Sequence, residues 1–204
     1  MSRAWWNLCR SRIQDRKGEK AVLQVAPFER IARTFRAGLI RTGTAATFRG
    51  MSAKPIPDGY PAITPYLIID GAARAIDFYR DIFGATERMR MPALQGRIGH
   101  AELTIGGSLL MISDPCPEMK AFAPVPGATS PVSLYLYVAD VDATVARAVA
   151  AGATVTHPVE TKFYGDRSGG IIDPFGHHWH LGTHVEDVSP EEMQRRMAGM
   201  KTGG

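Results

Sequence analysis

The feature that most constrains the fold of this chain is a pattern of one strand, one helix and three strands that occurs twice. The first copy begins with the apolar run 66–69, which predicts a buried strand. A helical pattern follows over 72–83, where we expect Asp70 to cap the first turn and Gly84 to end the helix. The apolar residues of this segment fall on one helical face: Ala75, Ile76, Tyr79, Ile82 and Phe83.

The second copy repeats this order further along the chain. An apolar run at 134–138 predicts another strand, and Asp140 and Gly152 are placed to begin and end a second helix. The apolar face of that helix comprises Val141, Val145, Ala148 and Val149. Gly84-Ala85-Thr86, after the first helix, returns unchanged as Gly152-Ala153-Thr154. Because internal repeats determine architecture, we predict two modules of the same kind.

Three strand-like segments follow each helix. They are expected at 87–91, 100–105 and 108–112 in the first copy and at 154–158, 169–172 and 178–183 in the second. Gly106-Gly107 and Asp173-Pro174-Phe175-Gly176 have the composition of hairpin turns. The predicted fold class is therefore α+β, built from two paired βαβββ modules.

Domain boundaries follow from this pattern and from the prolines. We predict a domain over 58–187, made of module one at 60–114, a linker at 115–131 that contains five prolines, and module two at 132–184. Residues 188–204 are expected to form a helix and a tail, because Ser189 can cap a helix and Glu192 completes a capping box.

The first part of the chain differs from the rest in charge. Residues 1–50 carry eleven Lys or Arg against three acidic residues, which leaves 13 basic and 17 acidic residues in the remainder. The predicted domain is therefore mildly acidic, although the whole chain has a net charge of +4. A basic leader is thus expected at 1–57, either disordered or partly helical. Nucleic acid is not expected as a partner of the domain.

Three interpretations of this leader stay open. It is a basic amphipathic helix at a membrane surface, an Arg-rich transit peptide, or an extension that is not naturally translated, since Met51-Ser52-Ala53-Lys54 is typical of a protein start. No apolar run is long enough to span a membrane. Of the two cysteines, Cys9 lies in the leader and Cys116 in the domain, so no disulfide is expected within the domain. Such cysteine usage favours a cytoplasmic location.

Four motifs, in this order and spacing, resemble a known family: Thr64-Pro65-Tyr66-Leu67, Phe78-Tyr79, Phe163-Tyr164-Gly165-Asp166-Arg167 and Asp173-Pro174-Phe175-Gly176-His177. The paired modules that contain them resemble the vicinal oxygen chelate superfamily, also called the glyoxalase/bleomycin resistance/dioxygenase superfamily, and in particular its PhnB-like branch. The resemblance covers residues 58–187. It implies curved mixed sheets around a cleft, a small-molecule ligand and a homodimer that completes the site.

The same resemblance implies a divalent metal in the family's enzymes, held by four strand positions. Two of these positions carry Thr64 and Ser133, which are poor ligands, and the other two carry Glu102 and His180, which are good ones. Because residues two apart in a strand share a face, His100 is expected beside Glu102. A set of His100, Glu102 and His180 would suit Zn, Ni, Mn or Fe, with Glu102 also a candidate catalytic residue. The competing interpretation is that two histidines and one carboxylate occur at these positions by chance and that the cleft binds no metal.

Other side chains are candidates for ligand binding. Tyr135 and Tyr137 share one strand face, where aromatic walls would suit a flat ligand. Tyr164 and Arg167 lie in a motif before a strand, and a guanidinium there would hold an anionic or oxygen-rich ligand. An Asp166–Arg167 pair that fixes a turn is the structural alternative. Trp179 alternates with His178 and His180 and is expected to pack under a helix.

Two functions follow from these observations. The first is a protein that binds a small organic ligand in a cleft without a full catalytic metal set. The second is a metal-dependent lyase, isomerase or dioxygenase that acts on a substrate with vicinal oxygens. The sequence identifies neither a ligand nor a substrate.

Overall fold

The structure is a computed structural model that describes residues 54–125, 127–128 and 130–201. The predictions for residues 1–53 of the leader and for the last three residues of the tail lie outside the described residues. In the part that is described, no helix has the length and apolar character needed to cross a membrane.

The first module has the predicted order of elements. They are β1 (Tyr66–Ile68), α3 (Ala72–Phe83), β2 (Thr86–Pro92), β3 (Ile98–Ile105) and β4 (Ser108–Ser113). The strands form a sheet in the order β1-β4-β3-β2, in which β1 pairs parallel with β4 and the other pairs are antiparallel.

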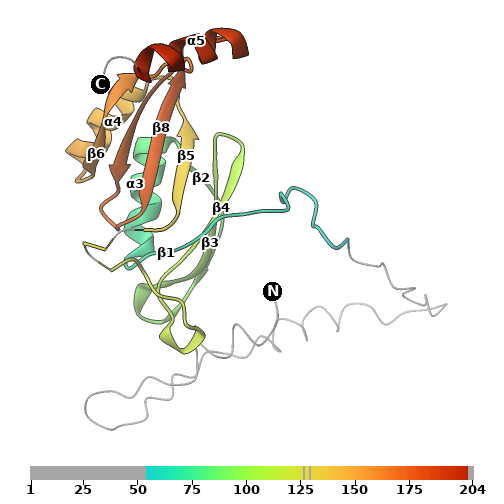
Figure 1. The fold of residues 1–204 in the computed structure, drawn as a ribbon. Coiled ribbons are helices and arrows are strands. Elements are labelled where there is room, and N and C mark those ends of the chain that lie inside the picture. The colour runs from blue at the N-terminus through green and yellow to red at the C-terminus, as the bar shows by residue number, and fades with distance from the viewer. Residues whose placement is uncertain (1–53, 126, 129, 202–204) are drawn as a thin grey trace, which may run out of the picture. The chain divides into compact units, whose positions relative to one another are not determined.

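The second module repeats this topology. Its elements are β5 (Ser133–Tyr137), α4 (Val141–Ala150), β6 (Thr154–Thr161), β7 (Asp166–Ile172) and β8 (His178–His184). The sheet order β5-β8-β7-β6, with a parallel β5–β8 pair, matches that of the first sheet strand for strand (Figure 1). The predicted α+β fold of two βαβββ modules is confirmed. A final helix, α5 (Pro190–Lys201), begins where the capping box predicts, and the backbone N–H of Glu192 donates to Ser189 Oγ at 3.2 Å.

The two long helices begin in different ways. Asp140 caps α4 as predicted, since its side chain accepts a hydrogen bond from the backbone N–H of Ala143. The prediction that Asp70 caps α3 is wrong. The buried carboxylate of Asp114, at the end of β4, instead accepts hydrogen bonds from the N–H groups of Gly71 at 3.0 Å and Ala72 at 3.2 Å. A residue from a neighbouring strand therefore satisfies the first helical N–H groups.

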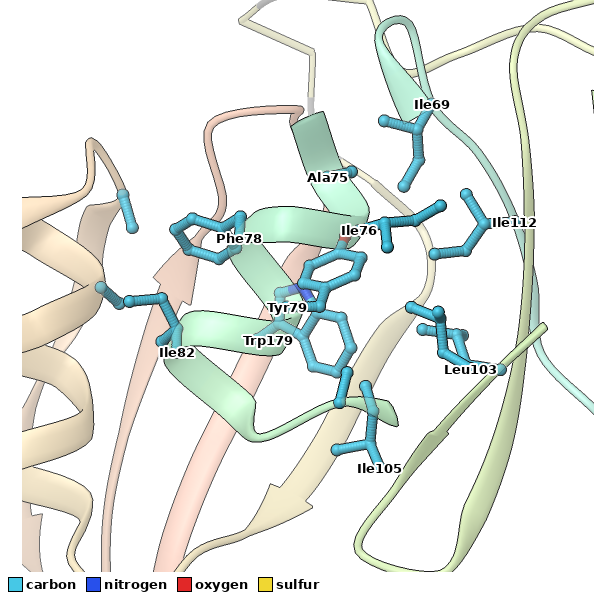
Figure 2. Close-up of a cluster of buried hydrophobic side chains, with 14 of the residues drawn as sticks. Ile69, Ala75, Ile76, Phe78, Tyr79, Ile82, Leu103, Ile105, Ile112 and Trp179 are labelled. Carbon is cyan, nitrogen blue, oxygen red and sulfur yellow. The ribbon is translucent and has the colours of Figure 1, made fainter. Parts of the chain in front are cut away.

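Helix α3 contributes to a core that includes residues of both modules. Ile76 points toward the first sheet, where Leu103 and Ile112 lie (Figure 2). On the side of the second module, the Trp179 ring of β8 lies 5.3 Å from the Tyr79 ring, measured between centroids. The prediction that Trp179 packs under a helix is confirmed. Since one face of the second sheet is occupied by this core, the opposite face of that sheet is the one available for a ligand.

Candidate functional site

The candidate site is the face of the second sheet that points away from the core. Tyr135 on β5 lies opposite His180 on β8, and Tyr137 lies opposite Gly182. Leu134, Trp179 and the other residues at alternate positions belong to or pack against the core, so these four residues share the other face. Tyr135 is 47% exposed and Tyr137 is 61% exposed, which is unusual for adjacent aromatic side chains on a sheet.

Both tyrosine hydroxyls donate to one oxygen of a single carboxylate. Tyr137 Oη lies 2.9 Å and Tyr135 Oη 3.3 Å from Oδ2 of Asp166, which is only 4% exposed. The two rings lie 4.9 Å apart between centroids and are tilted by 49°, so they form two walls that meet at an angle. Asp166 therefore fixes the positions of both tyrosines.

The second oxygen of Asp166 faces a histidine. His184, at the end of β8, lies 2.8 Å from Asp166 Oδ1 through Nδ1 and 3.0 Å from Asp187 Oδ1 through Nε2. Both ring nitrogens face carboxylates, so the doubly protonated imidazolium fits this geometry best. These hydrogen bonds, to Asp166 first and then to Asp187, raise the pKa of His184.

The electrostatics of the cluster keep Asp166 charged and the tyrosines protonated. Burial acts to raise the pKa of Asp166, but hydrogen bonds from His184, Tyr137 and Tyr135 outweigh it, and the pKa is lowered. Burial and the nearby Asp166 carboxylate raise the pKa of Tyr135 to about 12. The hydrogen bond to Asp166 and burial also raise the pKa of Tyr137. The tyrosines are therefore hydrogen-bond donors to a carboxylate at neutral pH.

A glycine makes this arrangement possible. Tyr135 on β5 reaches a carboxylate on β7, and β8 lies between these two strands. Gly182 of β8 leaves room for the crossing, because a Cβ atom at this position would meet the Tyr135 hydroxyl and would lie 3.0 Å from Cζ of the ring. Any larger residue at 182 would push the Tyr135 ring away from the sheet.

The structure brings Tyr164 near this cluster but not Arg167. The Tyr164 hydroxyl lies 3.4 Å from Oγ of Ser168, the β7 residue that shares the face of Asp166. Arg167 points to the opposite side of β7, where its guanidinium holds Asp142 of α4 in two hydrogen bonds of 2.6 Å each. The alternative expectation, an Asp166–Arg167 pair, is not what the structure shows, because the two side chains leave the strand on opposite faces.

Sequence reasoning missed the roles of Asp166, His184 and Gly182. A signal existed for Asp166 and His184, since they are cross-strand neighbours in the β7–β8 hairpin and lie nearly symmetrically about its turn. The sequence contains no such signal for Gly182, because its role is to leave space for the side chain of Tyr135. Tyr135 belongs to β5, which lies far from Gly182 in the sequence.

The first sheet holds the other predicted site residues. His100 and Glu102 are buried on adjacent same-face positions of β3, with His100 Nε2 lying 3.4 Å from Glu102 Oε1. The hydroxyl of Tyr66 lies 3.1 Å from His100 Nδ1, and the Arg88 guanidinium lies 4.0 Å from Glu102 Oε2. The predicted proximity of His100 and Glu102 is thus observed.

The described residues of one chain do not assemble the predicted metal ligands. His180 belongs to the second sheet, where its ring stacks at 6.3 Å from that of Tyr135. Within the described ranges, no three His, Cys, Asp or Glu side chains gather into a group suited to a metal ion. A structural or catalytic zinc site takes three or four protein ligands. Among the described residues His100 and Glu102 supply two, which is fewer than such a site takes.

A cavity of about 410 Å³ lies elsewhere, between the two modules and the linker. Its lining comes from β1, from residues within 122–132 on both sides of position 126, from Leu134 of β5 and from the start of β8, and includes Tyr66, Phe122, Val132, His177 and His178. It contains none of the Tyr135, Tyr137 and Asp166 cluster. The cavity is therefore a second candidate site for ligand binding, and an experiment has to distinguish it from the face that carries Tyr135 and Tyr137.

Comparisons with known proteins agree with the topology. The model of the Glyoxalase/Bleomycin resistance protein/Dioxygenase superfamily matches residues 62–181. An uncharacterized protein of Mycobacterium bovis is 44% identical over 146 residues, which is 70% of this chain and 96% of that protein. An uncharacterized protein of Mycobacterium tuberculosis (strain ATCC 25618 / H37Rv) shows the same identity over 70% of this chain and 86% of its own length.

Solved structures are similar over about 60% of this chain. TioX from Micromonospora sp. ML1 is 29% identical with a TM-score of 0.46, and the match covers 60% of this chain and 98% of that chain. A PhnB protein from Bacillus cereus is 21% identical with a TM-score of 0.49, over 60% of this chain and 99% of that chain.

Proposed function

Because the chain belongs to the glyoxalase/bleomycin resistance protein/dioxygenase superfamily, we propose that it binds a small organic molecule on the tyrosine face of the second sheet. This tyrosine face comprises Tyr135, Tyr137, Asp166, His180 and Gly182. The ligand lies with a flat part against the two tyrosine rings, and the hydrogen-bonded hydroxyls fix its orientation.

One observation carries this proposal: two exposed tyrosines are held in place by one buried carboxylate. Exposed aromatic side chains on a sheet are normally free to change rotamer, and fixing them has an entropic cost. Asp166 is itself buried and charged, which is costly unless its oxygens are hydrogen-bonded. A prearranged aromatic surface of this kind reduces the ordering cost of binding, which is how preorganised sites gain affinity.

Binding of planar organic molecules to the full chain tests the proposal. In an NMR screen of soluble aromatic compounds, we expect compounds that bind wild-type protein to lose binding in the double variant Tyr135→Ala/Tyr137→Ala. Phe122→Ala is the matched control, because Phe122 is also an exposed aromatic side chain, 65% accessible, but lines the linker cavity. Hits that survive the double variant and disappear in Phe122→Ala would place the site in that cavity and overturn the proposal.

We also propose that the functional unit is a homodimer, in which a second copy covers the exposed face and completes a cleft. The exposed apolar side chains at the edge strand β5 and in the segment before it, among them Val132, Tyr135 and Tyr137, support this proposal. Light scattering of the full chain is expected to give twice the mass of one chain. A monomer at working concentration would contradict the dimer but not the tyrosine face itself.

The alternative function is a metal-dependent lyase, isomerase or dioxygenase. The His100–Glu102 pair is the observation that favours it, since imidazole and carboxylate are ordinary metal ligands. Because the described residues bring no third such donor to this pair, we derive no catalytic step through a metal. Glu102 as a catalytic residue and His180 as a ligand remain predictions, as does a cytoplasmic location.

A further inference from the structure

We propose that the tyrosine face selects an organic cation, a flat molecule that carries a protonated amine next to its ring. This inference rests on the proposed function and adds the charge and hydrogen-bonding class of the ligand. It reverses the expectation drawn from Arg167, which favoured an anionic or oxygen-rich ligand.

The first argument concerns the hydroxyl hydrogens. A tyrosine hydroxyl has one hydrogen to donate and lone pairs to accept with. The hydroxyls of Tyr135 and Tyr137 both direct their hydrogen to Asp166 Oδ2. What each hydroxyl can still offer to a ligand is its oxygen as an acceptor. A ligand group that meets these oxygens must therefore be a donor, such as an ammonium N–H.

The second argument concerns the cationic side chains near this face. Arg167 points away from it and is held in two hydrogen bonds by Asp142. Lys162, just before β7, lies 3.0 Å from the carboxylate of Glu160. His184 directs both ring nitrogens to the carboxylates of Asp166 and Asp187. Each of these cations is thus already opposed by a carboxylate, and an anionic ligand gains little attraction from them.

The third argument concerns the local charge and the rings. Around the cluster, the carboxylates of Asp166 and Asp187 oppose the single imidazolium of His184, which leaves an excess of negative charge. The exposed faces of the Tyr135 and Tyr137 rings add the negative side of their quadrupoles. A cation over a tyrosine face is attracted more strongly as water is removed from it. The excess negative charge, the ring quadrupoles and the removal of water on binding all favour a positively charged ligand.

A matched set of three probes tests the inference: naphthylmethylammonium, naphthylmethanol and naphthylacetate. They share one ring system and differ in charge, so ring stacking cancels in the comparison. Affinities for the full chain are measured by NMR titration at neutral pH and low salt. We expect the ammonium to bind about tenfold more tightly than the carboxylate, the order expected for a partly desolvated cation–π contact with a hydrogen bond.

Variants connect this preference to the cluster. In Asp166→Asn, the amide donates to the tyrosine hydroxyls and releases their hydrogens toward the ligand, so the ammonium preference should fall to about twofold or less. Asp142→Asn is the matched control, because it removes an exposed carboxylate on the opposite side of the same sheet. It should keep the full preference. Should Asp166→Asn fail to fold, Tyr137→Phe removes one acceptor oxygen, keeps the ring, and should lower the preference severalfold.

The outcomes separate this inference from the function it rests on. If all three probes bind but the carboxylate binds as tightly as the ammonium, the selection of a cation is wrong and the proposed binding face stands. The inference also fails if Asp142→Asn reduces the preference as much as Asp166→Asn does. If no probe binds at millimolar concentration, both the inference and the proposed function are overturned.

Discussion

Tyr79 of the first module donates a 2.6 Å hydrogen bond from its hydroxyl to Oδ2 of Asp173 in the second module. Asp173 lies in the turn between β7 and β8 and is buried. Its carboxylate also accepts from Trp179 Nε1 at 3.0 Å and from the backbone N–H groups of Phe175 and His177 at 2.9 Å each. The aspartate of the Asp-Pro-Phe-Gly turn is therefore more than a turn residue: it fixes the turn and joins it to helix α3.

Removing the Tyr79 hydroxyl should weaken the connection between the modules. We expect Tyr79→Phe to lower the free energy of unfolding by about 1.5–3 kcal/mol, the range for a hydrogen bond to a charged group. Urea unfolding followed by tryptophan fluorescence measures the change. Tyr164→Phe serves as the control, because its hydroxyl makes only a 3.4 Å contact with Ser168, and it should change stability by less than about 0.5 kcal/mol. Equal effects of the two substitutions would contradict the role given to Asp173.

The His184–Asp166 contact predicts a dependence on pH. Because the folded-state pKa of His184 lies above the ordinary 6.5, the folded protein holds this proton more tightly than the unfolded chain does. Its contribution to stability is full below the unfolded pKa and is lost as pH rises through the folded pKa. An NMR titration of the His184 ring should show the raised pKa. Asp166→Asn should lower that pKa toward its ordinary value while Asp142→Asn leaves it unchanged; a His184 pKa at or below 6.5 in the wild type would refute the geometry.

The glycine at 182 should matter for binding more than for folding. Gly182→Ala places a methyl group against the Tyr135 hydroxyl, which is the end of an exposed side chain and can move. We expect the affinity for naphthylmethylammonium to fall about tenfold, while the free energy of unfolding changes by less than about 1 kcal/mol. Gly199→Ala in α5, where an added Cβ meets no atom of the described residues within 4 Å, is the control and should keep wild-type affinity. Unchanged affinity in Gly182→Ala would show that the position of Tyr135 does not matter.

Metal analysis separates the two candidate functions. After loading with Zn, Ni, Mn or Fe(II) and removal of excess ion, the wild-type protein should retain much less than one metal per chain, because no group of three metal-ligating side chains forms among the described residues. The variants Glu102→Ala and His180→Ala should retain the same small amount of metal as the wild-type protein. Stoichiometric metal that disappears in both variants would contradict this expectation and favour the alternative, a metal-dependent enzyme.

Much of the fold could be predicted because its signals are local. The bounds of α3 are those of the apolar periodicity, and Asp140 caps α4 through a neighbour three residues away. Asp70 does not cap the helix, and the carboxylate of Asp114, 42 residues from Ala72, accepts the hydrogen bonds of the first N–H groups instead. A distant carboxylate of this kind leaves no local pattern in the sequence.

The site was predicted only in part, for a related reason. The shared face of Tyr135 and Tyr137 follows from strand alternation and was expected. Strand β7, however, begins at Asp166 and not at Gly169 as expected, and this extension sends Asp166 and Arg167 to opposite faces. Asp166 therefore contacts the tyrosines and His184, whereas Arg167 pairs with Asp142 on the other side of the sheet. Because the carboxylate and not the guanidinium lies at the tyrosine face, the expected ligand is a cation and no longer an anion.

The most direct test of the account is a chemical-shift map of the full chain titrated with naphthylmethylammonium. The account predicts that the largest amide shifts occur at Tyr135, Tyr137 and Gly182, on the open face of the second sheet. Shifts confined to the linker cavity around Phe122, Val132 and His178, with Tyr135, Tyr137 and Gly182 unaffected, would contradict it.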